Sequence, residues 1–311
     1  MRRHFWILLA VACAACSAGT SASSVAYRKQ FLLSVPVHVV YVNLNDRSVK
    51  VTVAMSKRGR GSSELASSIV SRTRPTAAVT GTFFDTRSLL PTGDIVIAGV
   101  LVHSGCVGPA LCVTRDNRAR IIPHKFRSRR GRDYDTILAG GPTLVHDGHI
   151  ALNPRREGFT DSRIFRPNRR TAAGVTLANK VLLVSVNKPI SLHRLARIML
   201  KLGAAEAIML DGGSSTAMYA NGRFILHPAR RLTNVLLAYE SPEAYRRAAP
   251  QLAPTVLTAK RLADLASLGR YGAGPGPEDP WYLRIARSSS STDSPTLWML
   301  GADAAITAWP H

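Results

Sequence analysis

Three glycine-rich segments, each directly after an apolar run, hold the side chains best suited to chemistry. They are residues 80–85 (Thr-Gly-Thr-Phe-Phe-Asp), 139–143 (Ala-Gly-Gly-Pro-Thr) and 210–215 (Leu-Asp-Gly-Gly-Ser-Ser). Glycines allow backbone N–H groups to approach a ligand closely, and consecutive N–H groups in such turns form a concavity suited to phosphate oxygens. A carboxylate beside that concavity, Asp85 or Asp211, could act as an acid or base or as a metal ligand.

The signatures of several common enzyme classes are absent from the sequence. It contains no Gly-x-Ser-x-Gly elbow, no Walker loop and no His-Glu-x-x-His motif, and its nine histidines are scattered. Ordinary serine hydrolase, NTPase and zincin chemistry therefore have no support.

Apolar strands and one helix are expected to position the glycine-rich segments. The predicted elements are strands at 76–80, 181–186 and 207–210 and a helix that begins after Ser191 and ends at Gly203. A strand, a helix and a strand of this length predict a parallel crossover. Asp211 would then lie at the carboxyl end of a strand, where α/β sheets gather their chemistry.

Shorter apolar runs predict the rest of the domain. Alternating residues indicate an opening hairpin, a short helix follows, and further strands come after it; the ranges are 35–42 and 49–53 for the hairpin, 62–71 for the helix, and 95–102, 119–122 and 235–238 for the strands. The expected fold class is therefore α+β: one domain at 30–240 with a mixed sheet, few helices and one parallel strand-helix-strand unit. Residues 241–311 are expected to form an appendage, helical and then poorly ordered.

The first residues have the pattern of a targeting segment. A basic start at Arg2 and Arg3 precedes an apolar run at 5–16 and then small residues. The run is too short to span a bilayer, which needs roughly 20 apolar residues. We expect a signal peptide within residues 1–26, cleaved after Ala22 or Ala26. A lipoprotein signal is the alternative, because Cys13 and Cys16 resemble lipobox endings.

Export also bears on the cysteines. Of four cysteines, Cys13 and Cys16 belong to the targeting segment, which leaves Cys106 and Cys112 in the mature chain. In an oxidising compartment these two are expected to form a disulfide across a short Gly/Pro loop. Two free buried thiols are the alternative. The expected location is the periplasm, the cell surface or the extracellular space.

The charge of the chain indicates anionic partners. Lys and Arg number 41 against 19 Asp and Glu, a net charge of +22, so the surface should attract phosphates, polyanions or an anionic envelope. Aromatic residues make up 6% and do not interleave with the basic runs, whereas single-strand nucleic-acid sites need stacking platforms. We expect no nucleic-acid partner, and contact with a membrane only through a lipid anchor.

Several motifs, taken in order, carry a resemblance to a known family. They are Gly81-Thr-Phe-Phe-Asp85 with Pro91-Thr-Gly93, Gly140-Gly-Pro-Thr-Leu144 with Asp147-Gly148, Arg170-Thr-Ala-Ala-Gly174, Leu202-Gly203 with Leu210-Asp-Gly-Gly-Ser-Ser215, and Arg231 with Asn234. From residue 35 to residue 239 the chain resembles the phosphodiester glycosidase family, which includes the enzyme that removes N-acetylglucosamine from a sugar phosphodiester. The Leu-Asp-Gly-Gly element is the most specific part of the match.

The resemblance implies hydrolysis of the bond between a sugar's anomeric carbon and a phosphate, by a secreted or lumenal enzyme acting on a sugar phosphodiester or an anionic glycopolymer. The residues to which it assigns substrate binding are Thr80, Gly81, Phe84, Gly140, Gly141, Thr143, Thr171, Gly212, Gly213, Ser214 and Asn234. Two positions depart from the family: Thr80 replaces an Asn, and Ser214 stands where a third glycine is common.

The chemistry of the residues agrees with this implication. Glycosidic cleavage commonly uses two carboxyl groups, and Asp85 and Asp211 are the expected pair. A phosphate leaving group needs charge neutralisation more than protonation, a task for a guanidinium such as that of Arg170. The stretch 155–170, with six arginines and two acids, supplies further candidates, although a solvated loop would have the same composition.

Alternative interpretations remain at this stage. Asp211 could cap the segment that follows it, Asp85 could stabilise an Asx turn, and Asn234 could hold a turn before a strand. Two other functions are also possible. The protein could be a non-catalytic basic envelope protein that binds an anionic polymer, or a metal-dependent phosphodiesterase in which Asp85 and Asp211 hold a cation such as calcium.

Overall fold

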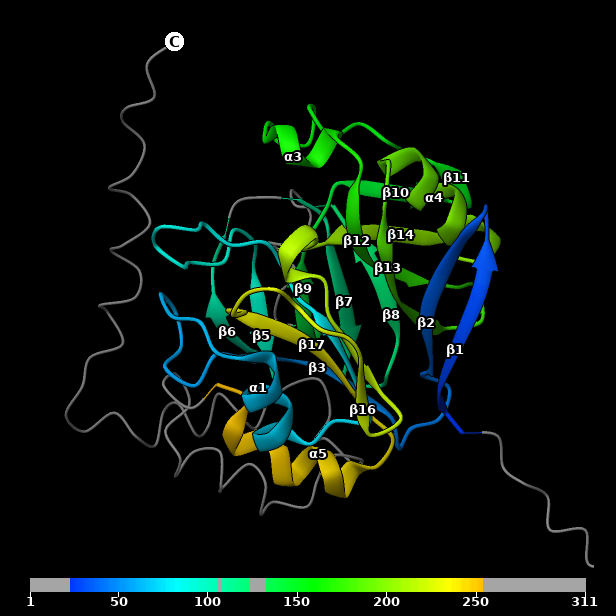
Figure 1. The fold of residues 1–311 in the computed structure, drawn as a ribbon. Helices are drawn as coiled ribbons and strands as arrows, with labels where there is room; N and C mark the ends of the chain where they lie inside the picture. The colour runs from blue at the N-terminus through cyan, green and yellow to red at the C-terminus, as the bar shows by residue number, and fades with distance from the viewer. Residues whose placement is uncertain (1–22, 106–107, 124–132, 254–311) are drawn as a thin grey trace, which may run out of the picture.

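The computed structural model describes residues 23–105, 108–123 and 133–253, which form three antiparallel sheets (Figure 1). The predicted targeting segment up to residue 22, Cys106 and most of the predicted appendage lie outside the described residues. Within the described ranges no helix is long and apolar enough to cross a membrane.

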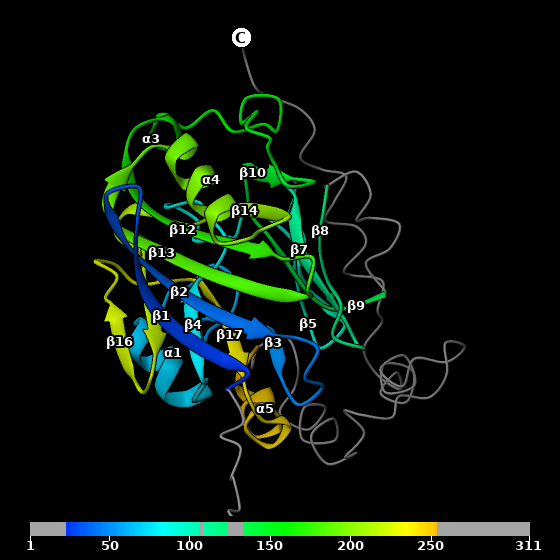
Figure 2. The ribbon, with the colours of Figure 1, turned by 90° about the vertical axis from the view of Figure 1, so that its right-hand side faces the viewer.

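The largest sheet has seven strands. Their order is β1 (Val25–Leu32), β2 (Val35–Asn43), β13 (Lys180–Ile190), β12 (Asn168–Val175), β14 (Glu206–Leu210), β10 (Thr143–His146) and β11 (His149–Ile150). Helix α4 (Leu192–Lys201) lies against one face of this sheet (Figure 2). The other face packs on the two smaller sheets.

The two smaller sheets have five strands each. The β4 sheet runs β16 (Arg223–Leu226), β15 (Met218–Ala220), β4 (Ala77–Thr80), β17 (Asn234–Tyr239) and β3 (Lys50–Met55). The β9 sheet runs β6 (Val100–His103), β5 (Ile95–Ile97), β9 (Tyr134–Ala139), β7 (Ala110–Thr114) and β8 (Ala119–Ile122). The remaining helical elements are α1 (Ala66–Thr73), α3 (Ser162–Phe165), α5 (Pro242–Ala248) and the 3₁₀ turns η2 (Gly213–Ser215) and η3 (Ala249–Gln251).

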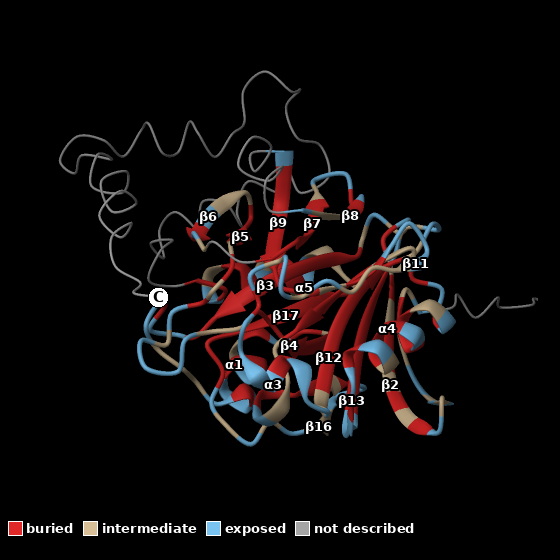
Figure 3. Cartoon of the chain, turned by 90° about the horizontal axis from the view of Figure 1, so that it is seen from above, coloured by how far each residue is buried: buried red, intermediate tan, exposed pale blue. Residues whose placement is uncertain are grey.

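Two large hydrophobic cores and a smaller one on the β9 sheet stabilise the fold. Figure 3 shows the buried strands at the centre of the molecule. The main core joins all three sheets through residues such as Leu183, Leu236 and Leu138. The second core lies under α4, where Leu195 and Met199 meet the outer face of the seven-stranded sheet. The helical spacing predicted from sequence therefore places the apolar side of α4 on the sheet.

Most predicted elements near the site are confirmed. β4, β14, β17 and α4 lie within one or two residues of the predicted ranges. Ser191 caps α4 as expected, because its side chain accepts a hydrogen bond from the Arg194 N–H at 3.2 Å.

The predicted opening hairpin is wrong. β2 pairs with β1 and β13, whereas β3 pairs with β17 in a different sheet. All six residues of β3 are buried, although β3 is the last strand of the β4 sheet, because the strands β9 and β5 of the neighbouring sheet pack against it. The hairpin that opens the domain is β1–β2, which begins at Val25, before the expected domain boundary at 30.

The predicted order of strand, helix and strand is confirmed by β13, α4 and β14. The two strands, however, do not pair directly with each other. β13 and β14 both pair antiparallel with β12, which lies between them. They run in the same direction and are joined by α4, yet they share no ladder. Every strand pair within the described ranges is antiparallel, so the mixed sheet expected from sequence is not found there.

Two smaller corrections follow from turns and packing. The predicted strand at 95–102 is a hairpin, β5 and β6, because Ala98 and Gly99 both have positive φ. The start of the predicted appendage belongs to the core: α5 places the ring of Tyr245 5.7 Å from that of Tyr239.

One junction between two sheets fixes the turn at 211–215. The Asp211 N–H donates to the Gly81 carbonyl at 3.0 Å, and the Thr80 hydroxyl donates to the Ser215 carbonyl at 2.6 Å. A Cβ on Gly81 would lie 1.9 Å from Asn234 Oδ1, an atom that is itself held by the Thr82 N–H at 2.8 Å. Only glycine fits at position 81 without displacing this buried amide.

Gly81→Ala should therefore destabilise the fold. We expect a loss of about 2 to 4 kcal/mol in the free energy of unfolding, measured by urea titration, because the new methyl group collides with a hydrogen-bonded buried side chain. Gly148→Ala is the control, since a Cβ there meets nothing within 4 Å and only its positive φ opposes the change. That control should cost about 1 kcal/mol. Equal losses at the two positions would contradict the crowding argument.

Candidate functional site

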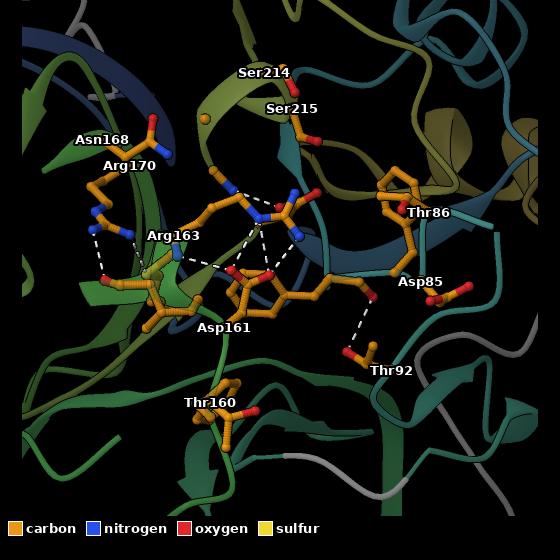
Figure 4. Close-up of a pocket in the computed structure, with 18 of the residues that line it drawn as sticks. Asp85, Thr86, Thr92, Thr160, Asp161, Arg163, Asn168, Arg170, Ser214 and Ser215 are labelled. Atoms are coloured by element: carbon orange, nitrogen blue, oxygen red, sulfur yellow. Dashed lines mark hydrogen bonds and ion pairs between the residues drawn. The ribbon is translucent and has the colours of Figure 1, made fainter. Parts of the chain in front are cut away.

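A cavity of about 460 Å³ opens at the junction between the sheets (Figure 4). Three segments form it: the loop after β4, the turn after β14, and the segment that contains α3 and the start of β12. The lining residues are Phe83, Phe84, Asp85, Thr86, Thr92, Gly158, Phe159, Thr160, Asp161, Arg163, Ile164, Asn168, Arg170, Met209, Asp211, Gly212, Gly213, Ser214, Ser215 and Arg230.

Asp211 supplies the carboxyl group with the most perturbed titration in the cavity. Burial raises the pKa of Asp211 to about 6, while hydrogen bonds from Ser215 and the Gly212 N–H and the charges of Arg230 and Arg163 pull it back. The Gly212 N–H contact is 2.8 Å long. A carboxyl group with a pKa near 6 can hold or release a proton close to neutral pH, as general acid–base catalysis requires.

Two guanidinium groups lie beside this carboxyl group and line the same cavity. Arg163 is exposed and forms an ion pair with Asp161 at 2.5 Å. Arg230 lies over the ring of Phe84, with 4.4 Å between its guanidinium carbon and the ring centroid. Two cations facing one cavity, each with surface in contact with solvent, form a site suited to a phosphate group.

Aromatic rings form the apolar part of the wall. The rings of Phe83 and Phe159 lie 6.1 Å apart at 58°, and Phe84 carries Arg230 on its face. The predicted assignment of Phe84 to the site therefore agrees with its position. Such surfaces fit the apolar face of a sugar ring beside a charged group.

Asp85 lines the cavity and also stabilises a turn. Its Oδ1 atom accepts hydrogen bonds from the N–H groups of Arg87 and Ser88 at 3.0 and 2.7 Å and from the Ser88 hydroxyl at 2.9 Å. This is the Asx-turn geometry considered from sequence. The hydrogen bond from the Ser88 N–H is the main reason that the pKa of Asp85 lies below its usual value. Asp85 is therefore already ionised at pH values at which Asp211 still holds its proton.

The position of Arg170 changes its expected role. Its side chain is 1% exposed, and its guanidinium donates to the carbonyls of Ile190, Ile164 and Arg166 at 3.2, 2.9 and 2.5 Å. Burial lowers the pKa of Arg170 to about 10. The anion clamp predicted at Arg170 is therefore not supported. Arg170 lines the cavity, but its guanidinium fastens the α3 segment to the end of β13, whereas Arg163 and Arg230 line the same cavity and stay in contact with solvent.

Several residues predicted to bind substrate lie behind the cavity wall. The sheet junction buries Thr80, Gly81 and Asn234. The Asn234 side-chain amide accepts a hydrogen bond from the Thr82 N–H and donates one to the Thr82 carbonyl. These three residues hold the loop that carries Phe84 and Asp85. The alternative of a turn-holding role for Asn234 is the one that the structure supports.

The second glycine segment is also part of the scaffold. Gly140 and Gly141 allow close packing, since a Cβ would lie 2.7 Å from the Met209 carbonyl or from the Phe159 ring. The Thr143 N–H and hydroxyl both donate to Glu157, at 2.9 and 3.1 Å. Thr171 is fully buried in β12. None of these four residues lines the cavity.

The third glycine segment lies in the cavity as predicted. Gly212, Gly213 and Ser214 line it together with Asp211. A Cβ on Gly212 would lie 2.7 Å from the Arg169 carbonyl, and Gly213 has a φ of 58°. Glycine is needed here for a close backbone approach and a left-handed turn, which is a different reason from a phosphate cradle.

The cavity does not fit a calcium ion. Arg163 and Arg230 place positive charge beside Asp211, and Asp85 already uses one oxygen for its turn. In the described part of the chain, a group of three potential metal ligands occurs elsewhere, at His146, Asp147 and Glu206, and it is largely exposed at the surface. The cation considered from sequence at Asp85 and Asp211 therefore gains no support from the geometry.

Sequence reasoning included Arg163 only as an unselected member of the stretch 155–170, and it missed Arg230. Arg163 belongs to the arginine-rich stretch, and the signal that could have selected it is Asp161, which caps α3 and pairs with it. Arg230 directly precedes Arg231, the arginine picked out by the family motif. Arg231 does not line the cavity, and its Nε donates to the Ser63 carbonyl at 3.3 Å.

The predicted disulfide is not tested. Cys112 is buried in β7, and Cys106 lies outside the described residues. The pairing stays a prediction.

A family model described as phosphodiester glycosidase matches residues 73–239. These residues include the β4 sheet junction, the α3 segment and the turn at 211–215. No curated protein sequence matches the chain closely enough to count as a relative.

Three solved structures share the fold at low sequence identity. The catalytic domain of zebrafish N-acetylglucosamine-1-phosphodiester alpha-N-acetylglucosaminidase, auto-inhibited by its pro-peptide, has a TM-score of 0.57 and 21% identity; the match covers 70% of this chain and 82% of that one. A hypothetical protein from Synechocystis has a TM-score of 0.54 and 16% identity, covering 69% and 61%. An exported-protein candidate from Burkholderia pseudomallei has a TM-score of 0.54 and 16% identity, covering 66% and 74%.

The raised pKa of Asp211 predicts a stability change with pH. The folded state retains this proton up to about pH 6, whereas an unfolded aspartate loses it near pH 3.9, so the contribution of this group to stability falls as pH rises from about 4 to above 6. Asp211→Asn removes the titration. The variant should gain stability relative to wild type over that interval, by about 1 to 3 kcal/mol at pH 7.5. Urea titrations at pH 4.5 and 7.5 measure this, and a difference that does not change with pH would contradict it.

Arg170→Lys tests the positioning role. A single ammonium group cannot serve three separated carbonyls, so we expect a loss of about 1 to 3 kcal/mol in unfolding free energy. Arg169→Lys is the matched control, because Arg169 is only partly buried and reaches the Asn187 side chain at 3.5 Å. It should stay within about 0.5 kcal/mol of wild type. Unchanged stability at position 170 with a raised KM would restore the phosphate-binding role.

Proposed function

The chain belongs to the phosphodiester glycosidase family, and from this premise we propose that it is an exported hydrolase that cleaves the glycosidic bond of a sugar-1-phosphodiester. The observation that carries the proposal is the cavity in which Asp211, with a pKa of about 6, lies beside two guanidinium groups and a phenylalanine surface. Export is supported by the targeting pattern and the basic surface of the chain.

The proposed roles follow from charge. Arg163 and Arg230 bind the phosphate oxygens and neutralise the charge that gathers on the leaving phosphate as the bond to the anomeric carbon lengthens. Neutral Asp211 donates its proton to that phosphate, which leaves as a phosphomonoester. A water molecule adds its oxygen to the anomeric carbon, and its released proton returns the Asp211 carboxylate to the neutral form.

Asp85 is the proposed second carboxyl group. Its pKa lies below the usual value while that of Asp211 lies above, and such divergence separates a base from an acid. Asp161, a third carboxylate of the cavity, already accepts the Arg163 guanidinium. In Figure 4 Asp85 lies apart from that ion pair, across the cavity from Arg170. We assign Asp85 to stabilisation of the positive sugar in the transition state or to activation of the water.

The test is turnover of an N-acetylglucosamine-1-phosphodiester. Asp211→Asn keeps the shape of the turn and removes the proton, so kcat should fall by about two or more orders of magnitude while the fold survives. Free sugar and a phosphomonoester are the expected products. Release of a sugar phosphate would contradict the glycosidase, and absence of turnover for any phosphodiester would leave a binding protein.

A further inference from the structure

Two further depressions continue the cavity along the surface. The first is lined by residues 65–67, Phe224 and residues 227–231, and the second by residues 57–58 and 61–64, Ser68, Leu89 and Arg231. Arg230 lines both the cavity and the first depression. Arg231 lines both depressions. The three hollows are therefore consecutive, and we call the two outer ones the basic groove.

The walls of the basic groove are held in place by backbone pairing. The Glu64 N–H donates to the Leu232 carbonyl at 2.8 Å, and the Leu232 N–H donates to the Glu64 carbonyl at 2.9 Å. These bonds join the loop before α1 to the loop before β17, and Figure 1 shows the two loops side by side. Backbone hydrogen bonds within the chain therefore shape the groove, which limits the ordering cost of binding.

The charge of the basic groove is positive along its length. Lys57, Arg58 and Arg231 are exposed, and Arg230 is partly so. Glu64 is the one carboxylate among the described lining residues of the two depressions, and it forms an ion pair with Arg72 at 2.9 Å. The positive charge of the groove is thus left for a ligand with several anionic groups.

Apolar side chains line the first depression beside the cations. Leu65 is 50% exposed and lines the first depression together with Phe224, whose ring lies 5.0 Å from that of His227. Of the two arginines in this depression, Arg230 is shared with the cavity and Arg231 with the second depression. An apolar platform beside cations fits a sugar ring next to phosphates.

We propose that the basic groove binds further repeats of a polymeric substrate, a chain of sugars joined by phosphodiester bonds, one end of which enters the cavity. This proposal rests on the proposed function and specifies its substrate class. The proposed substrate is an anionic glycan of many repeats, because a single sugar phosphodiester would occupy the cavity and make no contact with the basic groove.

The experiment compares a monomer with an oligomer. The monomer is methyl N-acetylglucosamine-1-phosphate, and the oligomer is a synthetic tetramer of N-acetylglucosamine-1-phosphate repeats. The variant Arg58→Ala/Arg231→Ala removes two groove charges, and Arg120→Ala/Lys201→Ala is the matched control, because both of its residues are exposed and lie on β8 and α4. Binding of the labelled tetramer to the same pairs in an Asp211→Asn background gives a readout independent of turnover.

The expected result is selective. The groove variant should lose about tenfold in kcat/KM and in affinity for the tetramer, keep the monomer within about twofold, and bind with a weaker salt dependence than wild type. The control pair should match wild type on both substrates. Equal kcat/KM for monomer and tetramer in the wild type, or equal losses in groove variant and control, would overturn the proposal and leave the proposed function intact.

Two further outcomes separate the claims. Groove-dependent binding of the tetramer without turnover of either substrate would retain the groove and contradict the proposed function. A 12-nucleotide DNA strand tests the other common polyphosphate. DNA binding as tight as tetramer binding, with the same loss in the groove variant, would overturn the assignment to a glycan.

Discussion

The close approach of the turn at 211–215 to the end of β4 is the constraint on which the site depends. Two hydrogen bonds cross from one sheet to the other there, from the Asp211 N–H to Gly81 and from the Thr80 hydroxyl to Ser215. The absence of a side chain on Gly81 makes room for the Asn234 amide, which holds the next residue of the loop. The same junction therefore places Asp211 on one side of the cavity and the loop with Phe84 and Asp85 on the other.

The electrostatics of the cavity follow from that packing. Asp211 is half-buried in the turn that carries it, and burial raises its pKa more than the two nearby arginines lower it. This arrangement costs stability at neutral pH, where the group loses its proton, and lets Asp211 hold a proton beside the leaving phosphate up to about pH 6. Arg170, also buried, is bound by backbone carbonyls and secures the segment from which Arg163 reaches the cavity. Two arginines of one short stretch thus serve the site in different ways, one by contact and one by position.

The sequence predicted the local elements near the site better than it predicted their partners. Strand and helix ranges such as β4, β14 and α4 depend on apolar periodicity, which is visible in the sequence. The pairing of β3 with β17 and the insertion of β12 between β13 and β14 depend on contacts between distant residues, which periodicity does not encode. The glycine segments, which are visible in the sequence, predicted the correct region of the site. Their individual roles depend on distant contacts, so the packing role of Gly140 and Gly141 and the position of Arg230 in the cavity were not predicted. Whether a polar residue such as Asn234 faces a ligand or a neighbouring strand is decided by tertiary packing.

Hydrolysis in ¹⁸O-labelled water tests the central claim most directly, because cleavage on either side of the bridging oxygen gives the same free sugar and phosphomonoester. The account places the break between the anomeric carbon and that oxygen, with Asp211 donating to the phosphate and water adding to carbon. The phosphomonoester should therefore contain no ¹⁸O by mass spectrometry or ³¹P NMR. Incorporation of ¹⁸O into the phosphorus product would show attack at phosphorus and would contradict the assignment of this cavity to glycosidic cleavage.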